Sequence, residues 1–288
     1  DSPNELIEVK EELVMVNQED RFASWLESLP FCLAAILKVY HGQDQSAKDK
    51  YERLLHFFEC LAQFLATIHL SAFRGNREEI GEWELLKKKI NGKLHEQKFS
   101  VANPTFGLWN VINQLSVNHL KSVIEQEEPT VEYLYKTSSY RFLNLLLSKS
   151  LLGALSRANK FRNHWPAHGG AVAPDSPVAK RRHEEIKGVL EIAQKEIGRV
   201  FDQYRLMQAG LPTFVDGPIV TCNMKNMRGS NPSFDNEEVI LTPAPSTDRL
   251  YMHDKAEDKA LELLGVLQMI ETPQPASYFY NRMENEVP

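Results

Sequence analysis

A long apolar row over residues 48–72 places the strongest constraint on how this chain can fold. Seven side chains recur there at alternating steps of three and four residues: Tyr51, Leu55, Phe58, Ala62, Leu65, His69 and Ala72. Side chains at this spacing share one face of an α-helix. The row therefore predicts a long helix with a buried face, on which His69 is expected to be a satisfied core histidine.

Further helices are predicted across the first two thirds of the chain. Residues 77–90 carry a charged, amphipathic pattern, and Asn103-Pro104 predicts a helix start with Asn as the cap and Pro at the first position. Residues 139–162 form the most apolar of these helices, and a long helix follows over about 178–208. The helix over 139–162 has an apolar row of Leu143, Leu147, Leu151, Leu155 and Ala158. The helix over 178–208 has an apolar stripe of Ile186, Val189, Leu190, Ala193, Ile197, Val200, Tyr204 and Met207.

The character of the chain changes at Gly210-Leu211-Pro212. Eight of the fifteen prolines lie in the last 80 residues, whereas all four tryptophans precede them. Short runs at 218–222 and 238–242 are typical of strands between turns, with 261–270 and 277–282 as two further candidates. We expect a mainly α fold, with a helical domain over 1–208 and a small β-rich domain over 209–288.

Composition excludes several classes of protein. No segment reaches eighteen consecutive apolar residues, so no membrane span is expected. The three cysteines, Cys32, Cys60 and Cys222, lack metal-site or disulfide spacing and are expected to be buried in a cytoplasmic protein. The chain starts with polar residues, without a signal peptide or an initiator Met, and it ends abruptly. We therefore expect a piece of a longer chain, whose other domains would be partners.

Charge is unevenly distributed along the chain. The net charge is −6, which argues against a general nucleic-acid binder. Residues 141–183 nevertheless contain eight Lys and Arg side chains against Asp175 alone, which gives this segment +7 and leaves −13 for the rest. Such an island is expected where one site attracts a phosphate backbone, although a solvated helix face would show the same charges.

The segment 161–170, Phe-Arg-Asn-His-Trp-Pro-Ala-His-Gly-Gly, ends the most apolar helix within this island. Pro166 cannot continue the helix and the glycines permit a sharp turn, so Arg162 and His168 can converge from two sides of a bend. A fixed cation and an imidazole that titrates near neutrality suit a site that handles phosphate. The candidate catalytic residues are Arg162, Asn163 and His168, and the candidate substrate-binding residues are Lys160, His164, Arg181 and Arg182.

Arg162 lies on the same helical face as the apolar row of its own helix. A guanidinium at the inner end of such a row needs an anion or a partner, because burial of an unpaired charge is costly. A phosphate of the substrate would meet this need. The structural alternative is a salt bridge to Glu59 on the flank of the 48–72 row.

Other chemistries find little support in the sequence. His164 and His168 are four residues apart, but Pro166 spoils the helical geometry of a metal pair and no third ligand is evident, so no metal is expected. The P-loop, GxGxxG and GxSxG patterns are absent from the chain. No cofactor is therefore expected.

The helical chain and its motif together resemble the HEPN superfamily. That family is marked by an R-x(4–6)-H motif, often with Asn after the Arg, at the end of a late core helix; here the motif is Arg162-Asn163-His164-Trp165-Pro166-Ala167-His168. The resemblance covers roughly residues 30–208, with 73–137 as an elaboration of the bundle, and does not explain 209–288.

The resemblance implies a metal-independent endoribonuclease of an anti-phage defence or toxin–antitoxin system. His168 would be the general acid/base for attack of a ribose 2′-OH on the adjacent phosphate, Arg162 would stabilise the charge that develops there, and Asn163 would orient the phosphate or the histidine. RNA would be the partner, and a homodimer would place two motifs in one cleft. The alternative is a non-catalytic HEPN-like module for dimerisation or sensing in a larger defence-related protein.

Overall fold

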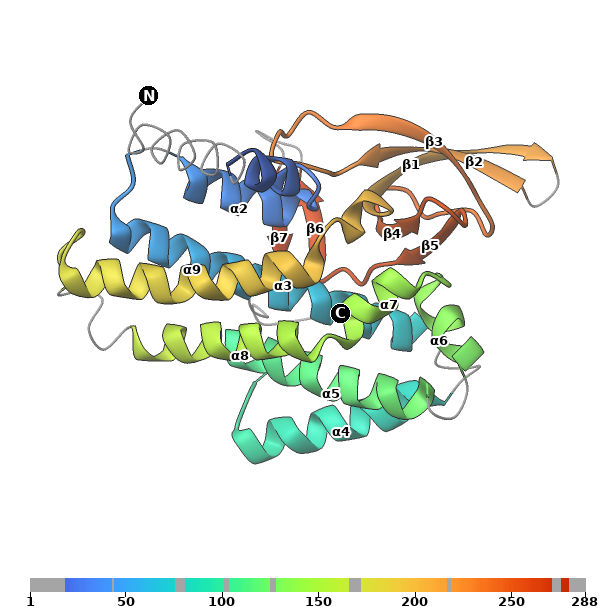
Figure 1. Cartoon of the computed structure of the whole chain (residues 1–288). Helices are drawn as coiled ribbons and strands as arrows, with labels where there is room; N and C mark the ends of the chain where they lie inside the picture. Colours follow the sequence, from blue (N-terminus) through green and yellow to red (C-terminus); the bar gives the residue numbers. More distant parts are fainter. Residues whose placement is uncertain are drawn as a thin grey trace, which may run out of the picture.

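The computed structural model describes residues 19–42, 44–75, 81–100, 104–124, 128–165, 172–216, 219–270 and 276–279. Helical residues 19–26 precede the helices α2 (Phe31–His41), α3 (Ala47–Gly75), α4 (Glu82–Gln97), α5 (Phe106–Ile124), α6 (Glu128–Tyr135), α7 (Tyr140–Leu147), α8 (Lys149–His164) and α9 (Pro177–Ile197). A short 3₁₀ helix, η2 (Val200–Asp202), leads to the strands β1 (Tyr204–Asp216), β2 (Ile219–Asn226), β3 (Asp235–Leu241), β4 (Leu250–Asp254), β5 (Lys259–Glu262), β6 (Leu267–Ile270) and β7 (Ala276–Phe279). The expected mainly α fold with a smaller β-rich part is confirmed (Figure 1).

Helix α3 lies at the centre of the helical layer. It contacts α2, α5, α8 and α9 along its length, and α4, α6 and β5 as well. All seven side chains of the predicted row are at most 3% exposed, and Phe57, Leu61 and Phe64, which lie off that row, are fully buried. The segment Ala47–Arg74 is long and apolar enough to cross a membrane by length and composition alone, but 78% of its most apolar window is buried inside the protein.

The strands form an antiparallel sheet with the order β3-β2-β1-β4-β5, and β6 and β7 pair separately. Strands are thus confirmed at 219–222 and 238–241, whereas β4 was not predicted and the 261–270 candidate is divided between β5 and β6. One core joins both layers: Phe64 of α3 packs against Phe201, with ring centroids 5.9 Å apart, and this cluster continues to Leu206 and Met252 of the sheet. The proposed domain boundary at 208/209 lies inside β1.

Two predicted helices have different limits. The helix expected over 139–162 is broken at Ser148, whose extended backbone separates α7 from α8 and whose hydroxyl accepts a hydrogen bond from Leu151 N, as an N-cap does. The helix expected over 178–208 ends at Ile197, because Gly198 adopts a positive φ of 50°. Tyr204 and Met207, assigned to that helix by their spacing, lie instead on β1.

Two local interpretations are also corrected. The start of α5 is capped by Thr105, whose hydroxyl accepts a hydrogen bond from Leu108 N, and not by Asn103, which lies outside the described residues. Gly210-Leu211-Pro212 is not a boundary, since β1 runs through it with a shift of register between Ala209 and Pro212. A Cβ at Gly210 would lie 2.5 Å from Asn223 O, so this bulge requires glycine.

A buried polar network joins the helices to the sheet. The Thr137 hydroxyl, just after α6, is hydrogen-bonded to Asp254 Oδ2 of β4 at 2.7 Å and to the Tyr204 hydroxyl of β1 at 3.1 Å. Tyr204 also stacks on Phe142 of α7, with ring centroids 4.3 Å apart. Asp254 is 1% exposed, so its hydrogen bonds replace those that it loses to water on folding.

The cysteines and His69 lie where the sequence predicts them. Cys32, Cys60 and Cys222 are buried free thiols. His69 Nδ1 lies 2.7 Å from the Tyr135 hydroxyl, and burial lowers the pKa of His69 to about 3, because the interior disfavours the charged imidazolium.

The buried His69 predicts a loss of stability in mild acid. In the unfolded chain His69 takes up a proton at about pH 6.5, and in the folded chain it does so only near pH 3. The contribution of His69 to the free energy of unfolding is therefore fully present above pH 6.5 and is lost as the pH falls from 6.5 toward 3. At pH 5 the loss is about 2 kcal/mol. Between pH 7.5 and pH 5, we expect the free energy of unfolding of wild type to fall by this amount relative to that of His69→Leu, as measured by urea titrations. An unchanged difference would contradict the assignment.

Candidate functional site

The predicted site lies at the end of α8, where three helices meet. Helices α8 and α9 are antiparallel neighbours: Ser148 Oγ, at the start of α8, donates a hydrogen bond to Glu196 Oε2, near the end of α9. The last turn of α8 therefore lies beside the first turns of α9, which brings Arg162 to the level of Arg182 along the pair. The start of α3 lies against the same end of the bundle (Figure 1).

The last turn of α8 is fixed to α3 by aromatic packing and two hydrogen bonds. Trp165 is 8% exposed and its ring centroid lies 4.6 Å from that of Tyr51. Trp165 Nε1 donates a hydrogen bond to Glu52 Oε1 at 3.0 Å, and the Tyr51 hydroxyl donates one to Phe161 O at 3.3 Å. Burial raises the pKa of Tyr51 to about 12, so this hydroxyl keeps its proton at neutral pH. These contacts hold the backbone on both sides of Arg162.

Arg162 continues the buried row of α8 toward solvent. Leu151, Leu155 and Ala158 are at most 1% exposed, whereas Arg162 is half-buried. Across the described parts of the chain, its guanidinium forms no ion pair with a carboxylate. The Glu59 alternative is not realised: the end of α8 lies beside Tyr51, and Glu59 is eight residues further along α3, about 12 Å along its axis.

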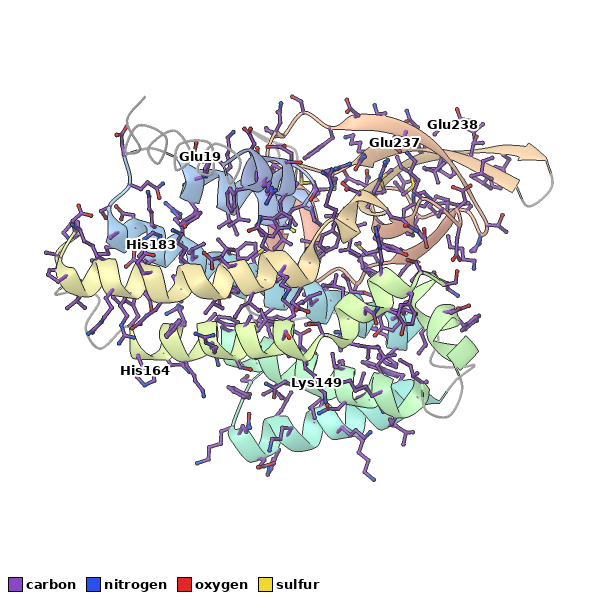
Figure 2. The ribbon with its side chains drawn as sticks, in the orientation of Figure 1. Glu19, Lys149, His164, His183, Glu237 and Glu238 are labelled. Carbon is purple, nitrogen blue, oxygen red and sulfur yellow. The ribbon has the colours of Figure 1, made fainter. Side chains whose placement is uncertain are left out.

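Asn163 and His164 are exposed at the end of α8. His164 Nδ1 lies 2.6 Å from Lys160 O, a carbonyl of the last turn, to which it donates a hydrogen bond. Figure 2 places His164 and Lys149 at the two ends of α8. His168 lies outside the described residues, so its convergence with Arg162 stays a prediction.

The two arginines expected to bind substrate are both engaged by one carboxylate. Arg182 Nη1 lies 3.0 Å from Glu185 Oε2, and Arg181 Nε lies 3.9 Å from Glu185 Oε1. Lys160, by contrast, is exposed on α8, and within the described chain no carboxylate is paired with it. Glu185 therefore reduces the positive charge on the α9 side of the site more than on the α8 side.

Helix α8 presents a row of basic side chains, two of which, Lys149 and Arg157, sequence reasoning counted in the basic island but did not place in the site. Lys149, Arg157, Lys160 and His164 follow one another at steps of eight, three and four residues and are all exposed, so they share the outer face of the helix. The sequence of α8 contains no carboxylate. The helical spacing of Lys149 and Arg157 relative to Lys160 and His164 was the signal that could have identified them as residues of the same face. We call these four residues the α8 cation row.

Position on the helix also stabilises part of this charge without any ligand. Lys160, Arg162 and His164 lie in or next to the last turn of α8, where the helix dipole is negative and favours cations. That effect is worth a few tenths of a kcal/mol to about 1 kcal/mol for each side chain at the surface. It accounts for cations at this end of the helix, but not for Arg157 and Lys149, which lie two turns or more before it.

Neither metal ligation nor similarity to known proteins adds a further assignment. Among the described residues, no group of three or more His, Cys, Asp or Glu side chains is arranged to hold a metal ion. Comparisons with protein-family models, with curated proteins and with solved structures gave no significant match.

Trp165 is predicted to hold the end of α8 in place. Replacement by Ala removes the stacking on Tyr51 and the hydrogen bond to Glu52 and leaves a cavity, so we expect Trp165→Ala to lower the free energy of unfolding by about 3 kcal/mol. Tyr51→Phe, which removes only a hydroxyl, should cost about 1 kcal/mol. Urea denaturation measures both effects, and an equal cost for the two variants would show that the aromatic contact does not fix this end.

Proposed function

We propose that the end of α8 binds the phosphodiester backbone of RNA and that the protein is a metal-independent endoribonuclease of the HEPN type. The observation that carries this proposal is the state of Arg162. It lies at the end of a buried row, on a turn fixed by Trp165 and Tyr51, and no carboxylate within the described chain neutralises it. A cation held in this way is prepared to receive an anion.

The reaction that fits these groups is transfer of a phosphodiester to the neighbouring ribose hydroxyl. The 2′-oxygen attacks phosphorus, the bond to the 5′-oxygen of the next nucleotide breaks, and the products are a 2′,3′-cyclic phosphate and a free 5′-hydroxyl. His168 moves the protons, removing one from the 2′-OH in the attack. Arg162 stabilises the negative charge that grows on the non-bridging oxygens. The second motif of a homodimer would complete the site by protonating the leaving oxygen.

A cation row beside the reacting group also suits RNA. Lys149, Arg157 and Lys160 extend over residues 149–160 of α8, a rise of about 17 Å, which is long enough to follow several phosphates of a single strand. RNA would lie along the outer face of α8 and pass round the end of the helix to reach Arg162, which lies on the face of the buried row.

One observation favours the second candidate, a non-catalytic HEPN-like module for dimerisation or sensing. Glu185 engages both Arg181 and Arg182, so two of the side chains expected to bind phosphate already have a partner. A module without a substrate would tolerate that pairing. The two candidates differ in one measurable property, which is cleavage of RNA without metal.

The cleavage test uses a mixed-sequence single-stranded RNA in the presence of EDTA. We expect wild type to produce fragments with 2′,3′-cyclic phosphate ends, and we expect Arg162→Ala and His168→Ala to be slower by about 10²–10⁴-fold. Arg141→Ala on α7 and His95→Ala on α4 replace exposed residues of the same types away from the site and should cleave at the wild-type rate. No cleavage by wild type, with a folded dimer in solution, would favour the non-catalytic module.

The α8 cation row is tested by the salt dependence of binding. A fully 2′-O-methylated RNA cannot be cleaved and isolates binding from reaction. The triple variant Lys149→Ala, Arg157→Ala, Lys160→Ala should reduce the slope of log affinity against log salt by about 2, since each contact to a single strand contributes about 0.7.

A triple variant of α4 serves as the matched control. Lys87→Ala, Lys88→Ala, Lys93→Ala changes the charge equally on another helix, where Glu84 and Glu96 already pair with Lys87 and Lys93. Equal slopes for the two triple variants would mean that RNA does not follow α8.

A further inference from the structure

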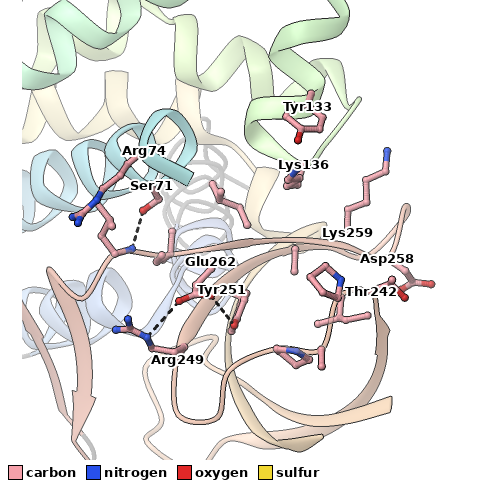
Figure 3. Close-up of a pocket in the computed structure, with 18 of the residues that line it drawn as sticks. Ser71, Arg74, Tyr133, Lys136, Thr242, Arg249, Tyr251, Asp258, Lys259 and Glu262 are labelled. Atoms are coloured by element: carbon pink, nitrogen blue, oxygen red, sulfur yellow. Dashed lines mark hydrogen bonds and ion pairs between the residues drawn. The ribbon is translucent and has the colours of Figure 1, made fainter. Parts of the chain in front are cut away.

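A large cavity lies between the end of α3 and the sheet, and one edge of β5 runs along it. Its volume is about 930 Å³, within the range of ligand sites. Ser71 and Arg74 line it from α3, Tyr133 and Lys136 from the end of α6, and the rest of the wall comes from residues 241–265 (Figure 3). Because β5 ends the order β3-β2-β1-β4-β5, this edge has no neighbouring strand among those described.

The hydrogen bonds between β4 and β5 show which backbone groups face the cavity. In an antiparallel pair, residues that exchange hydrogen bonds with the partner strand alternate with residues that do not. Leu263 N donates to Leu250 O at 2.7 Å, so the odd-numbered residues of β5 face β4 by the register of the two strands. The N–H and C=O groups of Ala260 and Glu262 therefore point away from β4, toward the open edge.

These outward groups of Ala260 and Glu262 have no partner in the part of the chain that is described. No hydrogen bond reaches the N–H or the C=O of either residue there. The N–H of Leu264, two residues further on, instead donates to Ser71 Oγ at 2.9 Å, which ties this end of the edge to α3. An extended chain laid beside β5 would supply the missing donors and acceptors.

The cavity offers a wall to each face of such a chain. Leu261 and Leu263 belong to the core that β5 shares with the helices, whereas Ala260 packs against a second cluster that includes Leu241 and Tyr251. Successive side chains of a strand point to opposite faces of the sheet. An added strand would thus direct alternate side chains to the helices and to the loop after β3.

The shape of the cavity favours a single extended chain over a larger occupant. Because α3 and α6 lie on one side of the edge and the loop after β3 on the other, a second folded copy would meet these walls first. Residues 258–263 extend over about 17 Å along the edge, the length of five or six residues of extended peptide. Pro243 and Pro245 of the loop have no N–H, so the loop cannot donate to the edge at these positions.

The charges of the lining favour an acidic segment at one end of the edge. Arg74 is exposed, and it forms no ion pair with a carboxylate in the described ranges of the chain. Two other cations of the lining, Arg249 and Lys259, are already paired with glutamates at 3.4 Å and 2.6 Å. Figure 3 shows Arg74 and Asp258 on opposite sides of the cavity. A carboxylate of the occupant is therefore favoured at the α3 end and disfavoured at the other.

We propose that the open edge of β5 binds an extended segment of a partner protein, which adds to the sheet as a further strand. Apolar side chains of this segment pack against Leu241 on one face and Leu261 on the other, and an acidic side chain meets Arg74. The site is independent of the proposed ribonuclease activity, because Glu52, at the α8 site, precedes Arg74 by twenty-two residues on α3, about 33 Å along its axis.

The test selects binders of the full chain from a displayed library of random twelve-residue peptides. We expect the enriched sequences to combine an acidic residue with neighbouring β-branched and other apolar residues. A synthetic peptide of such a sequence should bind to one site per chain. Failure to enrich any peptide that binds in solution would overturn the proposal.

Methylation of the peptide nitrogens, one residue at a time, detects strand pairing without any change in the protein. In a paired strand, every second residue directs its N–H to the partner strand. We therefore expect methylation to weaken binding about tenfold at alternate positions and to have little effect between them. Effects that are equal at successive positions would contradict strand addition.

Two variants and their matched controls locate the bound peptide. Ala260→Pro removes an outward N–H and leaves the hydrogen bonds to β4 in place, so it should weaken binding tenfold or more. Glu238→Pro, at an exposed position of β3 on the opposite edge of the sheet, should not. Arg74→Glu should weaken binding about fivefold at low salt, and Arg53→Glu, an exposed position of the same helix, should not. Thermal unfolding checks that all four variants fold.

Equal binding of the selected peptide to wild type and to Ala260→Pro would overturn the proposal, because the peptide would then occupy another surface. Synthetic peptides of residues 1–18 and 280–288 test for a terminal segment of this chain as the occupant. If either displaces the selected peptide from wild type and fails to bind Ala260→Pro, the partner protein is excluded as the occupant.

Discussion

The architecture of the protein depends on the burial of α3. A helix that is apolar on more than one face is stable in water only when other elements cover it around its circumference, because each exposed large apolar side chain would cost about 1.5–3 kcal/mol. Helices α2, α5, α8 and α9 cover its length, and β5 approaches its end. The positions of the remaining helices, and the side on which the sheet packs, follow from this requirement.

The α8 site and the large cavity lie at the two ends of this helix. At its start, Tyr51 and Glu52 hold Trp165 and so fix the turn that carries Arg162. At its end, Ser71 holds the segment after β5, and Arg74 lines the large cavity. The first is an exposed, cationic helix end, and the second is a cavity with a partly apolar lining.

The sequence predicted the elements whose patterns are local and missed those that depend on distant partners. The α3 row was found because its seven buried residues repeat at helical spacing, and Arg162 was placed on the row of α8 by the same phase. The strand β4 was missed because all five of its residues are buried, so it lacks the alternation of a surface strand. Ser148, at the break between α7 and α8, is hydrogen-bonded to the distant Glu196, and the large cavity is assembled from α3, α6 and the sheet, which no short pattern reveals.

The placement of the α8 site at one extremity of the bundle determines the geometry of any twofold pair built on it. Two copies that bring their Arg162 turns together would meet head to head, with the axis of symmetry near the starts of their α3 helices. The sheets would then occupy the two outer poles of an elongated particle, as the opposite positions of β1–β5 and the α8 terminus in Figure 1 require.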